Sequence, residues 1–513
     1  MWYDSGRVAG IYTSLKAMKI KYSVLTYLTA MMISGAHAGS VSVTTNADSG
    51  PGSLRDVLMT VANDDVIDFA PALNGATITL ISGALDITGL TLTLDASALP
   101  SGITLSGNHN SRILTIKKDE STNVIADVTL KNLHLRYGRA VNGNGGGVSA
   151  FQCHLVLDGG SIQDCFSDSD GGGLWGNGVT GSIQRCKIAG NQSGANGGGI
   201  FLIGINGTKS LDISSSQISG NVAPFGGGIY NLLANPTLWN CSIQGNSGSG
   251  MRSESSSNPV LRNCIVWGNT MSGGTAAASQ LNNESDSRPN VANCLIEGAA
   301  GAAGFMDGEL VVWGSGNLDG TAADNEPGFV GAVSAASAPN SAADLRFFTG
   351  SRCWNAGNNA FGGTSQDLAG NARVQDGTID LGAYEGGYVS FSHLYPALAP
   401  AGDENGNGLT NFFEYALGID PSGPGDASAL PAVSTRDGFL WLTSTRRSNG
   451  IDIAQSWETS TSLESLAWSP MIQGMHYQSD STSTIPPDRQ RVVFKLLVSD
   501  PARFYRQGFS GRN

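Results

Sequence analysis

A short phrase of three glycines and one aliphatic residue recurs along the middle of this chain. It begins at Gly145, Gly171, Gly197 and Gly226, and a reduced form, Gly-Met, begins at Gly250. Successive starts lie 24 to 29 residues apart. A period in this range predicts like units that stack on one another, because no single unit of that length buries its apolar face alone.

A second phrase, apolar-x-x-Cys-x-apolar, falls later in each repeat. The runs around it alternate apolar and polar residues and are broken by Gly, Asn and Ser, without the roughly 10 to 12 residues of 3.6-residue periodicity that a helix needs. The pattern predicts an all-β parallel β-helix, whose coils lie about 4.8 Å apart with like residues in columns. The central place of the phrase is held, in chain order, by Leu133, Cys186, Ser216, Cys241, Cys264 and Cys294.

The chain has seven cysteines, an odd number. In stacked coils, side chains in register point alongside each other rather than at each other, which favours a column of buried thiols. Disulfides between neighbouring coils are the alternative. Five of the seven fall near or on one column position: Cys165, Cys186, Cys241, Cys264 and Cys294.

Composition and the N-terminus narrow the class of protein. The formal net charge is −13 and only 14% of residues are charged, which argues against nucleic acid as a partner. Residues 1–38 are interpreted as a signal peptide, with Met18 as an alternative start, because a basic and then a short apolar stretch precede Ala36-His37-Ala38. No other stretch has 18 consecutive apolar residues, so no transmembrane span is expected in the mature chain. We expect a secreted or cell-surface protein.

The coil region is expected to span residues 39–388. It opens on a capping-box-like sequence at Ser53, which predicts a helix over residues 54–62 that covers the open end of the coils. Short, less regular strands are expected to follow before the glycine repeats begin.

Three stretches resemble known families. Residues 44–58, 78–97 and 103–116 are similar to the N-terminal region of secreted bacterial right-handed parallel β-helix proteins. The glycine and cysteine repeats resemble those of polymorphic outer-membrane proteins and related adhesins. Residues 366–385, QDLAGNARVQDGTIDLGAYE, are similar to the closing segment of choice-of-anchor cell-surface proteins. These resemblances imply a right-handed, pectate-lyase-like coil at a surface or secreted location, and no particular ligand.

After a linker over residues 389–402, the sequence fits the twelve-residue calcium-loop template D-x-[DN]-x-[DN]-G-x5-E. Residues 403–425 are interpreted as half an EF-hand with an exit helix over residues 411–417, because prolines stand where an entering helix would lie. The loop resembles dockerin-like calcium loops. With two carboxylates, a structural Ca²⁺ site of weak affinity, Kd about 10⁻⁴–10⁻³ M, is expected. The proposed ligands are Asp403, Asn405, Asn407, Leu409 through its carbonyl, Asn411 and Glu414.

Residues 429–513 alternate apolar and polar residues again and are expected to form a small β-sandwich. At 85 residues, the region is too short for an autotransporter barrel of at least eight strands of about ten residues.

Parallel β-helices also host polysaccharide lyases and hydrolases, so the charged residues of the coils are either catalytic candidates or solvated loop charges. The candidates are Asp158, Asp164, Asp168, Asp170, His134, Arg136, Arg139, Arg185, Lys187, Lys209 and Arg262. They match no lyase or pectin-hydrolase signature. Aromatic residues that would stack on sugars, or lie in the core, are Trp175, Phe201, Tyr230 and Trp267. The sequence favours a non-catalytic protein that acts in adhesion or carbohydrate binding. A lyase or hydrolase of acidic polysaccharide is the alternative.

Overall fold

The structure is a computed structural model. It describes residues 39–205, 210–305, 310–389, 394–395, 397–417, 419–424, 430–436, 439–447, 453–460, 469–470, 477–485, 489–496 and 504–511. The expected signal peptide, residues 1–38, and the candidate Lys209 lie outside these ranges.

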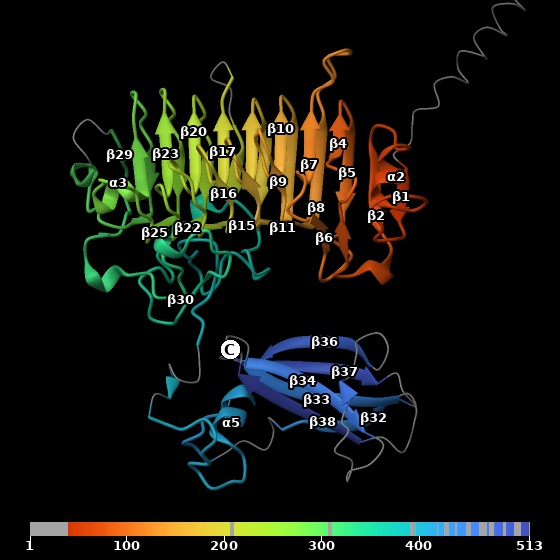
Figure 1. Ribbon diagram of the computed structural model, residues 1–513. Helices are drawn as coiled ribbons and strands as arrows, with labels where there is room; N and C mark the ends of the chain where they lie inside the picture. Colours follow the sequence, from red (N-terminus) through yellow and green to blue (C-terminus); the bar gives the residue numbers. More distant parts are fainter. Residues whose placement is uncertain are drawn as a thin grey trace, which may run out of the picture.

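The chain from β1 to β29 winds as a right-handed coil of about nine turns (Figure 1). One face is an eight-stranded parallel sheet, here called sheet B, with the order β26-β23-β20-β17-β13-β10-β7-β4. Its strands are β4 (Leu85–Thr88), β7 (Leu114–Lys117), β10 (Val148–Phe151), β13 (Leu174–Asn177), β17 (Ile200–Ile203), β20 (Ile229–Leu232), β23 (Met251–Glu254) and β26 (Leu281–Asn283).

The other faces form one large parallel sheet, here called sheet A, which bends once in most coils. Its strands are β1 (Ser40–Val43), β2 (Asp65–Phe69), β3 (Thr77–Thr79), β5 (Thr91–Asp95), β6 (Ile103–Ser106), β8 (Asp127–Arg136), β11 (His154–Gln163), β14 (Thr180–Gln184), β15 (Lys187–Ala189), β18 (Asp212–Ser214), β19 (Gln217–Ser219), β21 (Thr237–Trp239), β22 (Ser242–Gln244), β24 (Val260–Arg262), β25 (Ile265–Trp267), β27 (Asn290–Ala292), β28 (Leu295–Ile296) and β29 (Val312–Trp313). A small third sheet joins β9 (Arg139–Ala140), β12 (Phe166–Ser167) and β16 (Gln192–Ser193).

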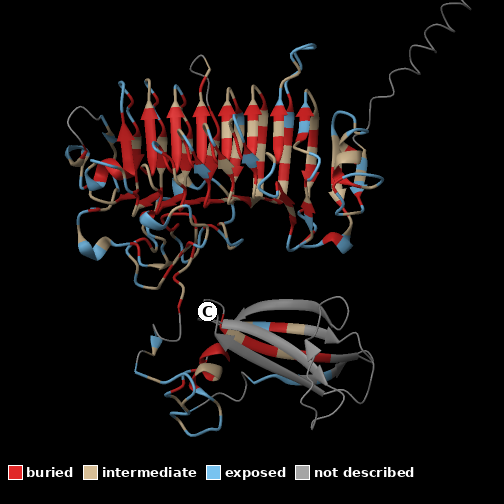
Figure 2. Ribbon diagram, viewed as in Figure 1, coloured by how far each residue is buried: buried red, intermediate tan, exposed pale blue. Residues whose placement is uncertain are grey.

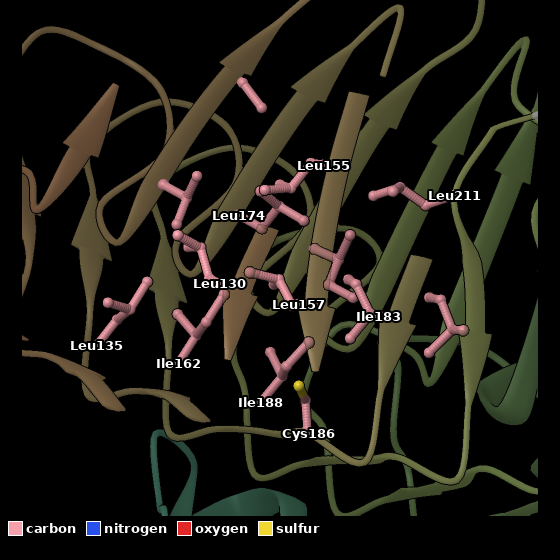
Figure 3. Close-up of a cluster of buried hydrophobic side chains, with 14 of the residues drawn as sticks. Leu130, Leu135, Leu155, Leu157, Ile162, Leu174, Ile183, Cys186, Ile188 and Leu211 are labelled. Atoms are coloured by element: carbon pink, nitrogen blue, oxygen red, sulfur yellow. The ribbon is translucent and has the colours of Figure 1, made fainter. Parts of the chain in front are cut away.

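The core runs along the axis of the coil as columns of aliphatic side chains. Figure 2 shows that many residues of the coil strands are buried. Figure 3 shows part of the core, in which Leu135, Ile162 and Ile188 occupy one register position on three successive coils. Each is 2% exposed or less. Burial of one such side chain stabilises by about 1.5–3 kcal/mol, and the column repeats that gain in every coil.

The predicted cysteine column is confirmed. The strand registers place Leu133, Gly160, Cys186, Ser216, Cys241, Cys264 and Cys294 at one position of successive coils. All seven cysteines are buried free thiols, and burial raises the pKa of Cys186 to about 12. Cys165, expected near or on the column, is not part of it. Cys165 lies one bend later, where the pairing of Ile162 with Ile188 aligns it with Asn191.

A second column at this later bend consists of buried asparagines. The backbone N–H of each residue donates to the side-chain oxygen of the next, from Asn191 to Asn221, Asn246 and Asn269, at 2.9 Å each. Each side-chain nitrogen donates to a backbone carbonyl of the neighbouring coil, as Asn221 Nδ2 does to Ile188 O at 3.0 Å. The column thus satisfies polar groups that the bend would otherwise bury without a partner.

The glycine phrase serves two different needs. Gly145, its first residue, has φ of +71°, a conformation that costs glycine nothing. At Gly146 the need is space, because an added Cβ would lie 2.3 Å from the carbonyl oxygen of Phe166 and 2.5 Å from that of Gly172. The interpretation of these glycines as bend residues therefore holds for the first position, and close coil-to-coil contact explains the second.

Short helices stand at the ends of the coil. Helix α2 (Leu54–Leu58) begins at Ser53, whose Oγ accepts from Asp56 N at 3.2 Å. It ends four residues earlier than predicted, because the chain turns at Asp64, φ +70°, to enter β2. Helix α3 (Ala276–Gln280) lies near the other end, where Gln280 Oε1 accepts from Asn269 Nδ2 at 2.7 Å and completes the asparagine column. The 3₁₀ helices are η1 (Pro71–Leu73), η2 (Ala302–Gly304), η3 (Ala323–Asn325), η4 (Ala335–Ser337) and η5 (Asn359–Phe361).

Residues 326–389, here called the return segment, fold back across the outer face of sheet A. The segment contains the antiparallel pair β30 (Phe329–Gly331) and β31 (Asp344–Phe347). Its hydrogen bonds to the coils are spread over the later half of the sheet. The coils around β5, β8 and β11 lie beyond these contacts.

The C-terminal part begins with helix α5 (Asn411–Leu417), which matches the predicted exit helix in its bounds. Two antiparallel sheets follow, and their arrangement as a sandwich stays a prediction. One sheet has the order β32 (Ala432–Arg436), β33 (Phe439–Arg447), β37 (Arg489–Leu496) and β36 (Tyr477–Ile485), and the other β35 (Ser469–Pro470), β34 (Ile453–Ser460) and β38 (Phe504–Gly511).

Candidate functional site

The outer face of sheet A carries charged side chains in register. Asp95, Lys131 and Asp158 are direct partners on successive coils. Lys131 Nζ lies 2.8 Å from Asp95 Oδ2, and Arg185 Nη2 lies 2.6 Å from Asp158 Oδ1. Opposite charges placed directly across a strand pair attract, so the alternation supports the register of the coils.

Lys131, Asp158 and Arg185 line a groove of about 540 Å³ between the early coils and the tip of the return segment. His134 lies in it, with Nδ1 3.1 Å from Ser161 Oγ. Burial, and then the neighbouring charge of Arg136, lower the pKa of His134, so this imidazole is neutral at pH 7. The groove therefore combines a neutral base with the cations of Lys131 and Arg185.

The structure brings only some of the predicted charged candidates into this groove. Its lining includes His134, Asp158 and Arg185, together with Lys131, which the sequence analysis did not single out. Arg136 is paired instead with Asp164 at 2.6 Å.

The remaining charged candidates have separate structural contacts. Asp168 accepts from Asn142 N at 2.7 Å, and Asp170 from Asn196 N at 3.1 Å. The others contact a ring or a polar partner elsewhere: Arg139 with Phe166, Lys187 with Ala343 O, and Arg262 with Asn290.

The four aromatic candidates divide into two positions. Trp175, Phe201 and Tyr230 are register partners on sheet B. Phe201 and Tyr230 stack with ring centroids 5.1 Å apart and are only 3% and 6% exposed, so they pack against each other rather than offer free faces. Trp175 is half-buried beside them. Trp267 is half-buried on sheet A and lines a second pocket of about 320 Å³.

The predicted calcium loop closes on itself through its own polar side chains. Asp403 accepts from Asn407 N at 3.0 Å and from Gly408 N at 2.9 Å. Asn405 Nδ2 and Asn407 Nδ2 both donate to Glu414 Oε1, at 3.0 and 2.6 Å. Asp403, Asn405, Asn407 and Glu414 thus converge on the loop interior.

Two of the predicted ligands have other contacts. Asn411 Nδ2 donates to Ala399 O at 2.9 Å, and its Oδ1 accepts from Glu404 N at 3.0 Å, so this side chain closes the loop from outside. Leu409 N donates to Asn407 Oδ1 at 2.9 Å. Within the part of the chain that the structure describes, no group of three or more His, Cys, Asp or Glu side chains is arranged to hold a metal, so the amide and carbonyl oxygens of this loop would carry much of any coordination.

One feature of the loop fits a cation. Glu414 is 0% exposed, and its Oε2 is buried without a hydrogen-bond partner among the described residues. A buried carboxylate oxygen without a partner costs free energy, and a cation in the loop would compensate it.

A cluster of four charged side chains in the return segment was not predicted. Asp367, Arg373, Asp380 and Glu385 are each 2% exposed or less, and Arg373 Nε lies 3.3 Å from Glu385 Oε1. Burial raises the pKa of Glu385 to about 8 and that of Asp380 to about 6, and it lowers the pKa of Arg373. In the sequence, this cluster is visible only as several charged residues within residues 366–385. The resemblance to choice-of-anchor proteins includes this stretch but assigns no role to its individual residues.

Residues 101–318 match the family model for a right handed beta helix region. The coil region is a right-handed β-helix of stacked repeats. No curated protein matches the chain. Among the described residues, no helix is long and apolar enough to cross a membrane.

Proposed function

We propose that this β-helix repeat protein is secreted or held at a cell surface, where it binds carbohydrate or other surface components without catalysis. The observation that carries the proposal is the pairing of charges on its outer face. Asp158, which lines the groove, and Asp164 are each bound to an arginine at 2.6 Å. At these two positions the surface therefore presents paired charges rather than free carboxyl groups.

Hydrolysis of a glycosidic bond needs two available carboxyl groups, about 5–5.5 Å apart for retention and about 6.5–9.5 Å apart for inversion. One oxygen of Asp158 and one of Asp164 accept from an arginine. A carboxylate that holds a guanidinium in this way has its charge compensated. It serves poorly as a nucleophile or as a proton donor. The same pairs suit a rigid binding surface, because they fix the side chains that a ligand would meet.

The test separates binding from turnover. The full-length protein is incubated with a panel of neutral and uronate polysaccharides, and both retention on the immobilised polymers and release of products are measured. We expect retention by at least one polymer with no new reducing ends and no unsaturated, ultraviolet-absorbing products. Product formation above the level of a heat-inactivated sample would contradict a non-catalytic role.

A second candidate function is cleavage of an acidic polysaccharide in the groove. It is favoured by the neutral His134, a possible base, beside the cations of Lys131 and Arg185, which would face a uronate carboxylate. If the panel gives unsaturated products, His134→Ala should abolish them. His109→Ala, at an exposed histidine that is not among the groove-lining residues, should leave them unchanged.

We further propose that the loop over residues 403–414 binds Ca²⁺ as a structural ion. Asp403, Asn405, Asn407 and Glu414 would hold it, with Leu409 O and Asn411 as the remaining predicted ligands. The ion would supply the positive charge that Glu414 Oε2 lacks. The helix that carries Glu414 is in turn fixed from both sides, because Tyr415 OH donates to Val389 O at 3.1 Å and Arg447 Nε donates to Tyr415 O at 3.0 Å.

Calorimetric titration of the full-length protein with Ca²⁺ tests this site. We expect one site with Kd of about 10⁻⁴–10⁻³ M. Glu414→Gln should remove the heat of binding, whereas Asp420→Asn, an exposed carboxylate beyond the loop and its helix, should keep it. A flat titration of the unaltered protein would exclude the site.

A further inference from the structure

We propose that the pocket at Trp267 binds a single unit of a neutral sugar. The inference rests on the proposed carbohydrate-binding function and assigns it a place and a ligand class. The pocket lies where the bend after β25 meets residues 326–335 of the return segment, and its volume is about 320 Å³. This is near the lower end of the roughly 300–1,000 Å³ typical of small-molecule sites, so it suits one small ring rather than a long chain.

Both walls of the pocket are fixed before any ligand arrives. Gln244 Nε2 donates to Val333 O at 2.7 Å, and Gln244 Oε1 accepts from Val333 N at 3.2 Å, which fastens the return segment to β22. Ser351 Oγ donates to Pro327 O at 2.7 Å at the other side of the same wall. A preformed pocket loses little conformational entropy when it binds.

The aromatic wall is also held in place. Trp267 packs against the buried cluster that includes Ile265, Leu295 and Phe347, and Phe329 packs against the same cluster from the return segment. Trp267 is nevertheless half-buried rather than enclosed, and it lines the pocket. It therefore offers a rigid apolar surface, which matches the apolar C–H face of a pyranose ring.

The polar groups around this surface determine the ligand class. Thr270, Glu326 and Ser334 are exposed lining residues that carry two hydroxyls and one carboxylate. These groups can bond sugar hydroxyls and orient the ring. The lining contains no Lys or Arg, and the chain has a net charge of −13, so an acidic sugar would meet repulsion without compensation.

The groove near His134 differs from this pocket in the charges that line it. That groove carries Lys131 and Arg185 beside Asp158, whereas the Trp267 pocket has the rings of Trp267 and Phe329, one carboxylate and no cation. An anionic polymer would thus be directed to the groove and a neutral one to the pocket. Sugar class is therefore the property that distinguishes the two sites.

Calorimetry of the full-length protein with soluble α-mannan, β-glucan and polygalacturonate tests the inference. We expect at least one neutral polymer to bind. Glu326→Gln replaces a charged acceptor by a neutral one, and Trp267→Phe removes part of one aromatic contact, so each should reduce the affinity about five- to tenfold. Glu120→Gln, at an exposed glutamate in an early loop, is the control and should bind as the unaltered protein does.

Urea unfolding of each variant shows whether it is folded. If Trp267→Phe is unstable, the binding affinities of Glu326→Gln and Thr270→Ala, both at exposed positions, test the pocket instead. Binding of neutral polymers with unchanged affinity in these variants would overturn the pocket while leaving the proposed function intact. Binding of polygalacturonate alone would also overturn it. Absence of binding to every polymer would overturn both.

Discussion

The stacked coils and the return segment are held by different kinds of contact. In the coils one bond recurs at each level, as from Asn191 to Asn221 and from Asn221 to Asn246, and every partner is the equivalent residue of the next repeat. Each contact between the return segment and the coils occurs once and joins residues far apart in the chain. Gln244 and Val333 are 89 residues apart, and Gln217 and Tyr384 are 167 apart.

The two regions should therefore fail in different ways. A coil that loses one bond keeps its aliphatic columns, because each coil is also supported by its neighbours. The return segment depends on one buried cluster, in which Arg373 is the only cation beside Asp367, Asp380 and Glu385. Removal of one member of such a cluster leaves buried charge without compensation.

The largest effect is expected from Arg373→Met. The substitution removes the cation and leaves three buried carboxyl groups, which should destabilise the return segment by about 3–5 kcal/mol. Hydrogen exchange followed by mass spectrometry should show loss of protection across residues 333–389 with the coils still protected. Arg352→Met, at an exposed arginine of the same segment, is the control and should leave exchange unchanged. Equal loss of protection in the coils would contradict the separation of the two regions.

Asn221→Ala should have the next largest effect, and in the coils. It removes the acceptor for Asn191 N and the donor to Ile188 O, both buried, at an expected cost of about 2–3 kcal/mol in the free energy of unfolding. Urea unfolding followed by circular dichroism measures the loss. Asn110→Ala, at an exposed asparagine of an early coil, should change it by less than about 0.5 kcal/mol. Similar losses in both variants would show that the column adds no particular stability.

The coils could be predicted from the sequence because each repeat contains the same phrases, and these phrases align on successive coils. The alignment of Cys186, Cys241 and Cys264 follows from one phrase, apolar-x-x-Cys-x-apolar, that the chain repeats, so the β-helix was predictable. Cys165 was only placed near or on the column, because Ile162-Gln163-Asp164-Cys165 also has the apolar-x-x-Cys pattern and this pattern does not show which of two bends a residue occupies. The asparagine column was missed because an asparagine beside a glycine has the same appearance whether it lies in an exposed turn or in a buried bend.

The return segment could not be predicted in this way. Nothing in the local pattern connects Gln217 with Ala343, or Asn263 with Asn358, because these contacts have no counterpart elsewhere in the chain. The pocket at Trp267 depends on such a contact, so sequence alone indicated the tryptophan but not its surroundings. The calcium loop is the reverse case, since its ligands are local in sequence, and its occupancy stays a prediction.

A pH titration should also distinguish the two regions. Burial raises the pKa of Asp380 to about 6 and that of Glu385 to about 8, above their ordinary values of 3.8 and 4.5. The native return segment therefore holds protons that the unfolded chain releases. The associated stability is fully present below about pH 4 and is lost as pH rises through about 6 and then about 8.

Hydrogen exchange, corrected for its intrinsic pH dependence, should show protection of residues 333–389 falling from pH 5 to pH 9. The neutral asparagine column should keep its protection over the same interval. Glu385→Gln preserves the acceptor for Asp380 N and removes the titration, so it should flatten the upper part of the profile. A profile that is the same in both regions, or that rises with pH in the return segment, would contradict this assignment.

The smallest effect is expected from Cys264→Ser, a substitution for which the chain contains its own precedent. Ser216 occupies the same column, where its Oγ donates to Ser214 O at 2.7 Å and accepts from Cys186 N at 3.1 Å. A serine at position 264 would find the equivalent Arg262 O, which the thiol contacts at 3.2 Å. We expect a loss of about 1 kcal/mol or less in urea unfolding, because the hydroxyl exchanges weak sulfur contacts for hydrogen bonds at some cost of burial. A loss of unfolding free energy as large as that of Asn221→Ala would contradict this expectation. It would mean that the packed thiols stabilise the coils as much as the asparagine hydrogen bonds do.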